Sequence, residues 1–289
     1  MTWADAAAFA AMLVWGANFP VIKRLMGVID PIPLMFIRGS ASSVLLTAML
    51  WRRGGWRVPD RAEIPTLLGV GLLGHTLNQI LYAVGLSLTT ASHSGLIFTL
   101  TPLFVFGLSH VLGHVRIRGV DLIGLGLGIG GAGLILGAPV IGGTVTTAAV
   151  SGDLLTLGSA ILWGAWTIVA APLLRRRGTL VGTTWITIVG TIGLVPFAVP
   201  GLARQDWRLS GSVIASLIYA STIGGPLGSL LWYAAVRRLG AARAMIYANL
   251  EAFFAVAAAA LMLGERVEAT AVLGGVTIVI GVLLTRRGG

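Results

Sequence analysis

The sequence contains no cysteine and very little charge. Of its 289 residues, 10% are charged and 56% are hydrophobic, whereas a soluble domain carries about 25% charged residues. Without cysteine, disulfide bridges and thiolate metal sites are excluded. With so few charges, the chain cannot cover a soluble domain with polar side chains, so we expect an integral membrane protein.

Motifs of several other functional classes are also absent. There is no Gly-x-x-x-x-Gly-Lys-Ser/Thr loop to bind nucleotide phosphates, so transport by a built-in ATPase is excluded. There is no His-Glu-x-x-His motif and no cluster of aspartates, so no catalytic residue, metal or cofactor is predicted. The net charge of +10 would suit nucleic acid, but loop arginines orient membrane spans, and no nucleic-acid partner is expected.

Long apolar runs separated by short turns make up nearly the whole chain. A helix needs about 20 residues to cross a hydrocarbon core of about 30 Å, and pairs such as Asp30-Pro31 mark turns between runs of that length. The pattern predicts an all-α membrane protein with ten transmembrane helices. They are expected at residues 4–24, 31–51, 64–86, 90–113, 118–138, 151–172, 179–200, 211–235, 241–264 and 268–285.

Basic residues are distributed unevenly between the predicted loops. Arginines concentrate after the even-numbered spans, for example at Arg52, Arg53 and in the run 175–177, and at the C-terminal end. The loops on the opposite side hold few of them. Because cytoplasmic loops carry the excess of Lys and Arg, both termini are expected in the cytoplasm, and the protein in a bacterial inner (plasma) membrane.

The second half of the chain echoes the first. Trp-Gly-Ala at 15–17 returns at 163–165. Such matches predict one five-span repeat over 1–140 and a second over 150–289. An odd number of spans gives the repeats opposite orientations in the membrane, which is the inverted repeat typical of secondary transporters. The alternative is that the repeat serves folding alone.

Two predicted spans, 118–138 and 268–285, hold almost no polar side chains. Gly124 and Gly131 of the first match glycines 150 positions later in the second. Small residues at helical spacing let membrane helices approach closely. We expect these spans to form a scaffold beside the helices that carry the substrate site; dimerisation through the first of them is an alternative.

Three stretches carry a family resemblance. They read WGANFPVIK, LYAVGLSLTTASHSGLIFTLTPLF and LWYAAVRRLGAARAMIYANLEAFFAVAAAALMLGERV. In order and spacing they resemble the EamA domain of the drug/metabolite transporter superfamily, in two copies that cover nearly the whole chain. The resemblance implies ten helices in inverted five-helix repeats and export of small metabolites, often amino acids. More narrowly, the chain is similar to the bacterial aromatic amino acid exporters.

The second copy departs from the first at two positions. Trp166 stands where the first copy has Asn18, and Arg38 has no counterpart that the sequence pattern identifies. We therefore expect the two halves to contribute differently to a substrate site.

Polar and aromatic side chains share helix faces within several spans. A polar side chain in hydrocarbon should face the bundle interior or a water-filled cavity, and residues three or four apart lie on one face. A stripe on span 64–86 that holds four hydrogen-bonding groups favours a cavity over interhelical hydrogen bonds alone. The predicted substrate-binding residues are Trp15, Asn18, His75, Asn78, Gln79, Tyr82, Phe98, Thr101, Trp163, Trp166, Tyr247 and Glu251.

Two charged residues lie well inside predicted spans, away from the span ends. Glu251 is near the middle of span 241–264, where a carboxylate is a candidate proton carrier or partner of a substrate ammonium; a structural hydrogen bond or ion pair is the alternative. Arg38 lies within span 31–51. Its alternatives are a substrate carboxylate, helix carbonyls or Glu251, and a structural role is favoured.

The leading hypothesis is a secondary transporter that exports aromatic or neutral amino acids, or similar small metabolites, by alternating access. Its partners are the small-molecule substrate and the lipid bilayer, and no oligomeric state is predicted. A multidrug exporter of lipophilic cations is the alternative. Small multidrug relatives use an acidic residue within their first span, whereas the only acidic residue of the first span here is Asp5, at its very start. An intramembrane enzyme and a pore are alternatives of other classes.

Overall fold

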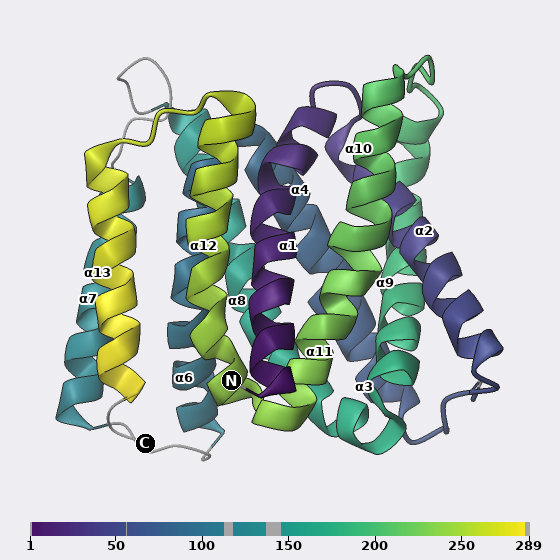
Figure 1. The fold of residues 1–289 in the computed structure, drawn as a ribbon, viewed down its shortest axis with the longest axis horizontal. Helices are drawn as coiled ribbons and strands as arrows, with labels where there is room; N and C mark the ends of the chain where they lie inside the picture. Colours follow the sequence, from purple (N-terminus) through teal and green to yellow (C-terminus); the bar gives the residue numbers. More distant parts are fainter. Residues whose placement is uncertain (1, 56, 113–117, 137–145, 287–289) are drawn as a thin grey trace.

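The computed structural model describes residues 2–55, 57–112, 118–136 and 146–286. Within these ranges the chain is helical and holds no strand (Figure 1). The predicted spans 90–113 and 118–138 extend at their ends to residues outside the described ones. The helices of the first half are α1 (Trp3–Leu25), α2 (Pro31–Arg52), α3 (Ile64–Leu68), η1 (Gly69–Leu77), α4 (Asn78–Leu88), α5 (Ala91–Ile97), η2 (Phe98–Leu100), α6 (Thr101–Val111) and α7 (Gly119–Leu136).

The second half follows the same order of helices, except that its fourth helical rod is uninterrupted. Its helices are α8 (Thr147–Arg177), α9 (Thr179–Leu202), α10 (Gly211–Thr222), η3 (Ile223–Leu227), α11 (Gly228–Leu239), α12 (Ala241–Leu263) and α13 (Ala269–Arg286). Among the described residues, seven helical segments are long and apolar enough to cross a membrane, and α7, α12 and α13 contain shorter apolar stretches. The all-helical membrane fold is thus confirmed. That ten helices cross the membrane, with both termini cytoplasmic, stays a prediction.

Three of the helical rods change their winding near the middle. Wider π-helical turns lie in η1 and η3, and a tighter 3₁₀ turn, η2, joins α5 to α6. In η3, Pro226 has no N–H group to donate to a carbonyl of the preceding turn, which explains the interruption there. Such breaks free backbone carbonyls and are common at functional sites.

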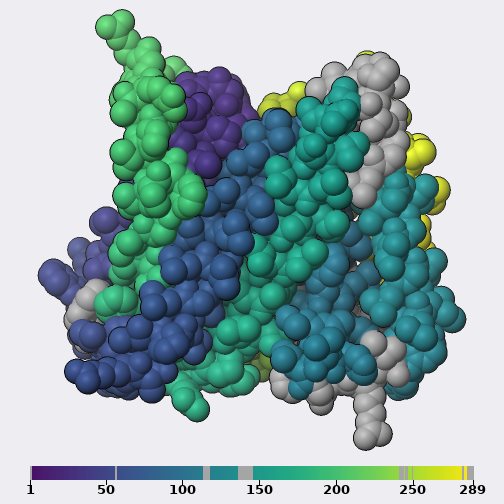
Figure 2. Space-filling model, turned by 180° about the vertical axis from the view of Figure 1, so that it is seen from behind, coloured from purple at the N-terminus to yellow at the C-terminus, as the bar shows by residue number. Residues whose placement is uncertain are grey.

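The two halves interlock rather than lie side by side. In the first half, α1 packs against α11 and α12 of the second; α8 makes the matching contacts with α4 and α6. Figure 2 shows α4 and α8 next to one another on the rear face. The remaining pairs are α2 with α9 and α7 with α13. Each half therefore contributes helices to the centre of the bundle.

The contact between α7 and α13 depends on matched glycines. A Cβ atom on Gly131 would lie 2.5 Å from the carbonyl oxygen of Gly274, and one on Gly281 would lie 2.5 Å from that of Gly124. Both distances are far below van der Waals contact, so any side chain would force the helices apart. Because Gly124 matches Gly274 in the repeat, and Gly131 matches Gly281, the two contacts are related by exchange of the halves.

At the end of the bundle where α1 ends, polar side chains clamp the turn between α4 and α5. Lys23 donates to the carbonyl of Leu86 at 2.7 Å and to that of Thr89 at 2.6 Å. The Thr89 hydroxyl donates to Asp153 Oδ1 at 2.5 Å, and His93 Nδ1 lies 3.1 Å from Asp153 Oδ2. Helices α1, α5 and α8 are thereby joined at this end.

An ion-pair cluster joins the opposite end of α8 to the segment before α3. Arg177 Nε donates to Glu63 Oε1 at 2.7 Å, and the guanidinium also pairs with Asp60. The hydrogen bond from Arg177 lowers the pKa of Glu63 below its usual value. The cluster fixes the segment before α3 against the junction of α8 and α9.

Candidate functional site

A cavity of about 150 Å³ lies in the middle of the bundle, between the two halves. For comparison, an apolar cavity of about this size holds a benzene ring. Helices α1, α2, η1, α4 and η2 line it from the first half, and α8, α9, η3, α11 and α12 from the second. Its walls combine aromatic rings with amide, hydroxyl and charged groups, a mixture typical of small-molecule sites.

The structure brings together all but two of the predicted site residues. Those that line the cavity are Trp15, Asn18, His75, Asn78, Gln79, Tyr82, Phe98, Trp163, Trp166 and Glu251. The stripe on span 64–86 thus faces this cavity. Their role in binding a substrate stays a prediction.

Thr101 and Tyr247 do not line the cavity. Thr101 is fully buried against α8, with its methyl carbon 3.2 Å from a Cβ placed on Gly164. Its side chain is taken up by this contact with α8, which the spacing along a single span cannot show. Tyr247 is one turn from Glu251 towards the start of α12, where its hydroxyl donates to Asp5 Oδ1 at 2.9 Å.

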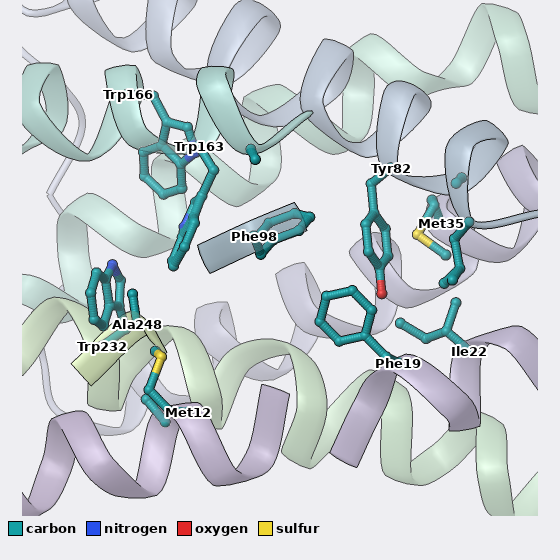
Figure 3. Close-up of a cluster of buried hydrophobic side chains, with 14 of the residues drawn as sticks. Met12, Phe19, Ile22, Met35, Tyr82, Phe98, Trp163, Trp166, Trp232 and Ala248 are labelled. Carbon is teal, nitrogen blue, oxygen red and sulfur yellow. The ribbon is translucent and has the colours of Figure 1, made fainter. Parts of the chain in front are cut away.

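Aromatic rings form the apolar wall of the site. Figure 3 shows Trp163, Phe98 and Tyr82 in a row, with Phe19 facing the last two. The ring centroids of Phe98 and Trp163 are 5.8 Å apart, and that of Phe19 is 5.5 Å from both Phe98 and Tyr82. These edge-on and tilted contacts fall within the favourable range for aromatic pairs.

Two side chains of the cavity wall donate hydrogen bonds to helices of the second half. Trp15 Nε1 donates to the carbonyl of Gly224, in the π-helical turn η3, at 3.0 Å. Asn78 Nδ2 donates to the carbonyl of Ser159 at 2.8 Å and to its hydroxyl oxygen at 2.9 Å. These bonds fix the Trp15 and Asn78 side chains in place.

Several polar atoms that border the cavity have no hydrogen-bond partner among the described residues. They are Asn18 Oδ1, His75 Nε2, Trp166 Nε1, Thr183 Oγ1 and Glu251 Oε2. Buried polar groups are normally satisfied, and leaving one unpaired is costly. Five such atoms around one cavity therefore indicate a polar occupant, either a ligand or water.

Arg38 also lines the cavity, although the sequence favoured a structural role for it. Its guanidinium donates to the carbonyl of Ala220 at 3.3 Å and contacts Met35 Sδ at 3.1 Å, and the side chain is buried. Arg38 forms no ion pair with any residue in the described part of the chain. The cavity thus contains a guanidinium from α2 and a carboxylate, that of Glu251, from α12.

The cavity lies where repeat counterparts meet. Trp15 and Trp163 occupy matched positions, and their ring centroids are 5.7 Å apart. Ser43 and Thr191, also 148 positions apart, share a hydrogen bond of 3.4 Å. Contacts between counterparts of this kind are expected along a two-fold axis that relates the halves.

The same offsets identify which residues break the symmetry. Gly16 packs on the backbone of Glu251, and its counterpart Gly164 packs on Thr101, so Thr101 is the counterpart of Glu251. Ile186 follows Arg38 by the same 148 positions that separate Ser43 from Thr191, so Ile186 is the counterpart of Arg38. Ile186 also lines the cavity. Sequence spacing alone could have found Ile186, because its offset from Arg38 equals that between the two Trp-Gly-Ala segments.

No group of three or more His, Asp or Glu side chains in the described ranges could hold a metal ion.

Comparisons with known proteins agree with this architecture. A family model described as the EamA-like transporter family matches residues 2–137 and 150–287. A crystal structure of a protein with 17% sequence identity superposes with a TM-score of 0.68, covering 98% of this chain and 96% of that one. At that identity the likeness shows the fold alone.

Two curated relatives match over nearly their full length. An uncharacterized transporter of Archaeoglobus fulgidus is 27% identical over 95% of this chain and 94% of its own length. A probable terminal-alkyne amino-acid exporter of Streptantibioticus cattleyicolor is 26% identical over 96% of this chain and 91% of its own.

Proposed function

Since the chain belongs to the EamA-like transporter family, we propose that it is a secondary transporter that exports amino acids. Its substrates are aromatic or other neutral amino acids, or similar small metabolites, and it moves them across the inner membrane by alternating access. It is a multi-pass membrane protein whose named relatives are transporters.

The observation that carries this proposal is the cavity between the halves. It combines an aromatic wall with unpartnered polar atoms and with charges of both signs. An amino acid with an apolar side chain has matching parts, namely a ring or alkyl group beside a dipolar backbone. The name of the Streptantibioticus relative, a probable amino-acid exporter, supports the same class.

The repeat supports alternating access. Helices α7 and α13 run in opposite directions (Figure 1) and contact each other through exchanged glycine pairs. A two-fold axis between antiparallel counterparts is perpendicular to them, which is the arrangement of an inverted repeat in a membrane. Exchange of the two repeats' conformations would then expose the central cavity first to one side and then to the other.

The predicted topology fits the same arrangement. Helix α1 begins and helix α13 ends at one end of the bundle (Figure 1). That end also holds Arg177, from the arginine-rich run 175–177. Together with the excess of arginine in these loops, this supports a cytoplasmic location of both termini and ten crossings.

A second candidate is an exporter of lipophilic cations. The unpartnered carboxylate of Glu251 in an aromatic cavity favours it. Arg38 in the same cavity opposes it, because a guanidinium repels a cationic substrate. Competition by cationic dyes distinguishes the two candidates.

The proposal is tested by counterflow in liposomes that contain the purified protein. Vesicles are loaded with unlabelled phenylalanine, and uptake of labelled phenylalanine is followed over time. We expect saturable exchange that other neutral amino acids inhibit and cationic dyes do not. Unsaturable flux of many neutral solutes would instead indicate a pore, and the absence of any amino-acid exchange would contradict the proposal.

A further inference from the structure

Among the described residues that line the cavity, one is an arginine, Arg38, and one is a carboxylic acid, Glu251. Both are buried, at 6% and 4% exposure. Neither forms an ion pair with a residue in the described part of the chain. An unpaired charge inside a membrane protein is costly, so two of opposite sign in one cavity require an explanation.

The two charges approach the cavity from different directions. Arg38 lies on α2 and Glu251 on α12, and these helices are on opposite sides of α1 (Figure 1). Tyr82 lines the cavity together with both side chains, and its ring belongs to the aromatic wall. A molecule in the cavity can therefore face a cation, a carboxylate and an apolar wall together.

Each of the two charges occurs in one half only and is missing at the matching position of the other half. The counterpart of Arg38 is Ile186, and the counterpart of Glu251 is Thr101. The helix contact at Glu251 thus does not need its carboxylate, because the other half makes the equivalent contact with Thr101. Gly164 packs on Thr101 as Gly16 packs on Glu251.

We infer that Arg38 binds the carboxylate and Glu251 the ammonium group of a free α-amino acid, so that both groups must be unblocked for recognition. The inference rests on the proposed function and specifies its ligand. The guanidinium is suited to a carboxylate because its planar N–H groups can bond both oxygens. Glu251 Oε2, which has no partner, accepts a hydrogen bond from the ammonium. The side chain of the ligand then contacts the aromatic wall.

The test uses three related ligands with the unmodified protein. Phenylalanine has both charges, phenylalaninamide lacks the carboxylate, and N-acetylphenylalanine lacks the ammonium. Each is tested as an inhibitor of phenylalanine counterflow. We expect each blocked compound to inhibit at least about tenfold more weakly than phenylalanine, because a site built for a polar group rejects an analogue without it. Equal inhibition by all three compounds would overturn the inference while leaving transport itself established.

Two variants then assign the subsites. In Arg38→Gln we expect inhibition by phenylalanine to weaken at least about tenfold, to the level of the amide, whose own inhibition is unchanged. In Glu251→Gln we expect inhibition by phenylalanine to weaken to the level of inhibition by N-acetylphenylalanine. If Arg38 and Glu251 had only structural roles, the variants would weaken inhibition by all three ligands alike, and that result would overturn the assignment.

Matched controls separate charge recognition from general damage. Thr101→Val alters the counterpart of Glu251, outside the cavity, and Arg24→Gln removes an exposed arginine at the end of α1. Both are expected to keep the ligand ranking of the unmodified protein. If Arg38→Gln does not fold, Arg38→Lys keeps the charge and should still prefer phenylalanine over its amide; loss of that preference would contradict the role of the cation. Absence of counterflow in the unmodified protein would contradict the proposed function instead.

Discussion

Single residues at the centre of this protein are constrained by how closely the helices approach. Gly16 is the sharpest case, since a Cβ there would lie 2.5 Å from Phe254 Cβ and 2.6 Å from the Glu251 carbonyl oxygen. Gly107, on α6, has no atom within 4 Å of the same position. The two glycines therefore differ in packing while both lie in helices.

Replacing each glycine by alanine gives opposite expectations. Gly16→Ala should separate α1 from α12 and destabilise the protein by about 1–3 kcal/mol, the usual cost of overpacking. Gly107→Ala should be neutral or stabilise by up to about 1 kcal/mol, because alanine favours a helix. Thermal unfolding of the purified variants measures both changes. An unchanged melting temperature for Gly16→Ala would show that the α1–α12 contact relaxes without cost.

Two adjacent threonines on α9, Thr183 and Thr184, differ in whether their hydroxyl groups have a hydrogen-bond partner. Thr183 Oγ1 has no partner, whereas the adjacent Thr184 donates to the Leu180 carbonyl at 2.7 Å. Thr183→Val removes an unsatisfied polar group, so stability should be unchanged or higher, while affinity for a cavity ligand should fall. Thr184→Val should lose about 1 kcal/mol of stability and keep its affinity. Counterflow and thermal unfolding of both variants, measured together, test this contrast, which fails if both variants change alike.

Helices and their ends are coupled by polar clusters that the apolar pattern does not reveal. The clamp at the end of α1 joins three helices through Asp153, which is almost fully buried and contacts Thr89 and His93. Because α5 belongs to the first half and α8 to the second, this cluster joins the two halves at one end of the bundle.

Removing the carboxylate should weaken that joint. Asp153→Asn replaces one of the two acceptor oxygens that Thr89 and His93 contact by an N–H donor, and leaving one buried group without its partner costs about 1–3 kcal/mol. We expect a lower melting temperature for this variant. The control Glu268→Gln changes an exposed acidic residue, so its melting temperature should equal that of the unmodified protein. Thermal unfolding measures the difference. A melting temperature equal to that of the unmodified protein would show that His93 and Thr89 find other partners.

The sequence predicted the elements better than it predicted the site. Apolar length located the helices because the bilayer thickness sets their size, and helical spacing placed His75 and its neighbours on one face. Thr101 was misplaced because its side chain packs against Gly164 of α8, a contact between helices that spacing within one span does not contain. Arg38 was underestimated because its position in the cavity depends on helix packing between the halves, which no local pattern contains.

At the scale of the whole molecule, the proposed two-fold relation between the repeats divides contacts into two kinds. Those between counterparts, such as Ser43 with Thr191, lie on the axis and are the same when the repeats exchange conformations. Those away from the axis, such as Thr89 with Asp153, have a different counterpart contact at the opposite end. Alternating access must break contacts of the second kind and can keep those of the first.

Cysteine pairs can test this division directly, because the natural chain has no cysteine. A disulfide between Thr89→Cys and Asp153→Cys would hold one end of the bundle closed, so counterflow should be lost on oxidation and return on reduction. The pair Ser43→Cys with Thr191→Cys joins the halves on the axis, so its oxidation should leave counterflow largely intact. Equal loss of exchange in both pairs, each shown to be crosslinked, would mean that α2 and α9 also separate during transport. Continued exchange with the first pair fully crosslinked would mean that this end of the bundle never opens, and it would contradict alternating access through the central cavity.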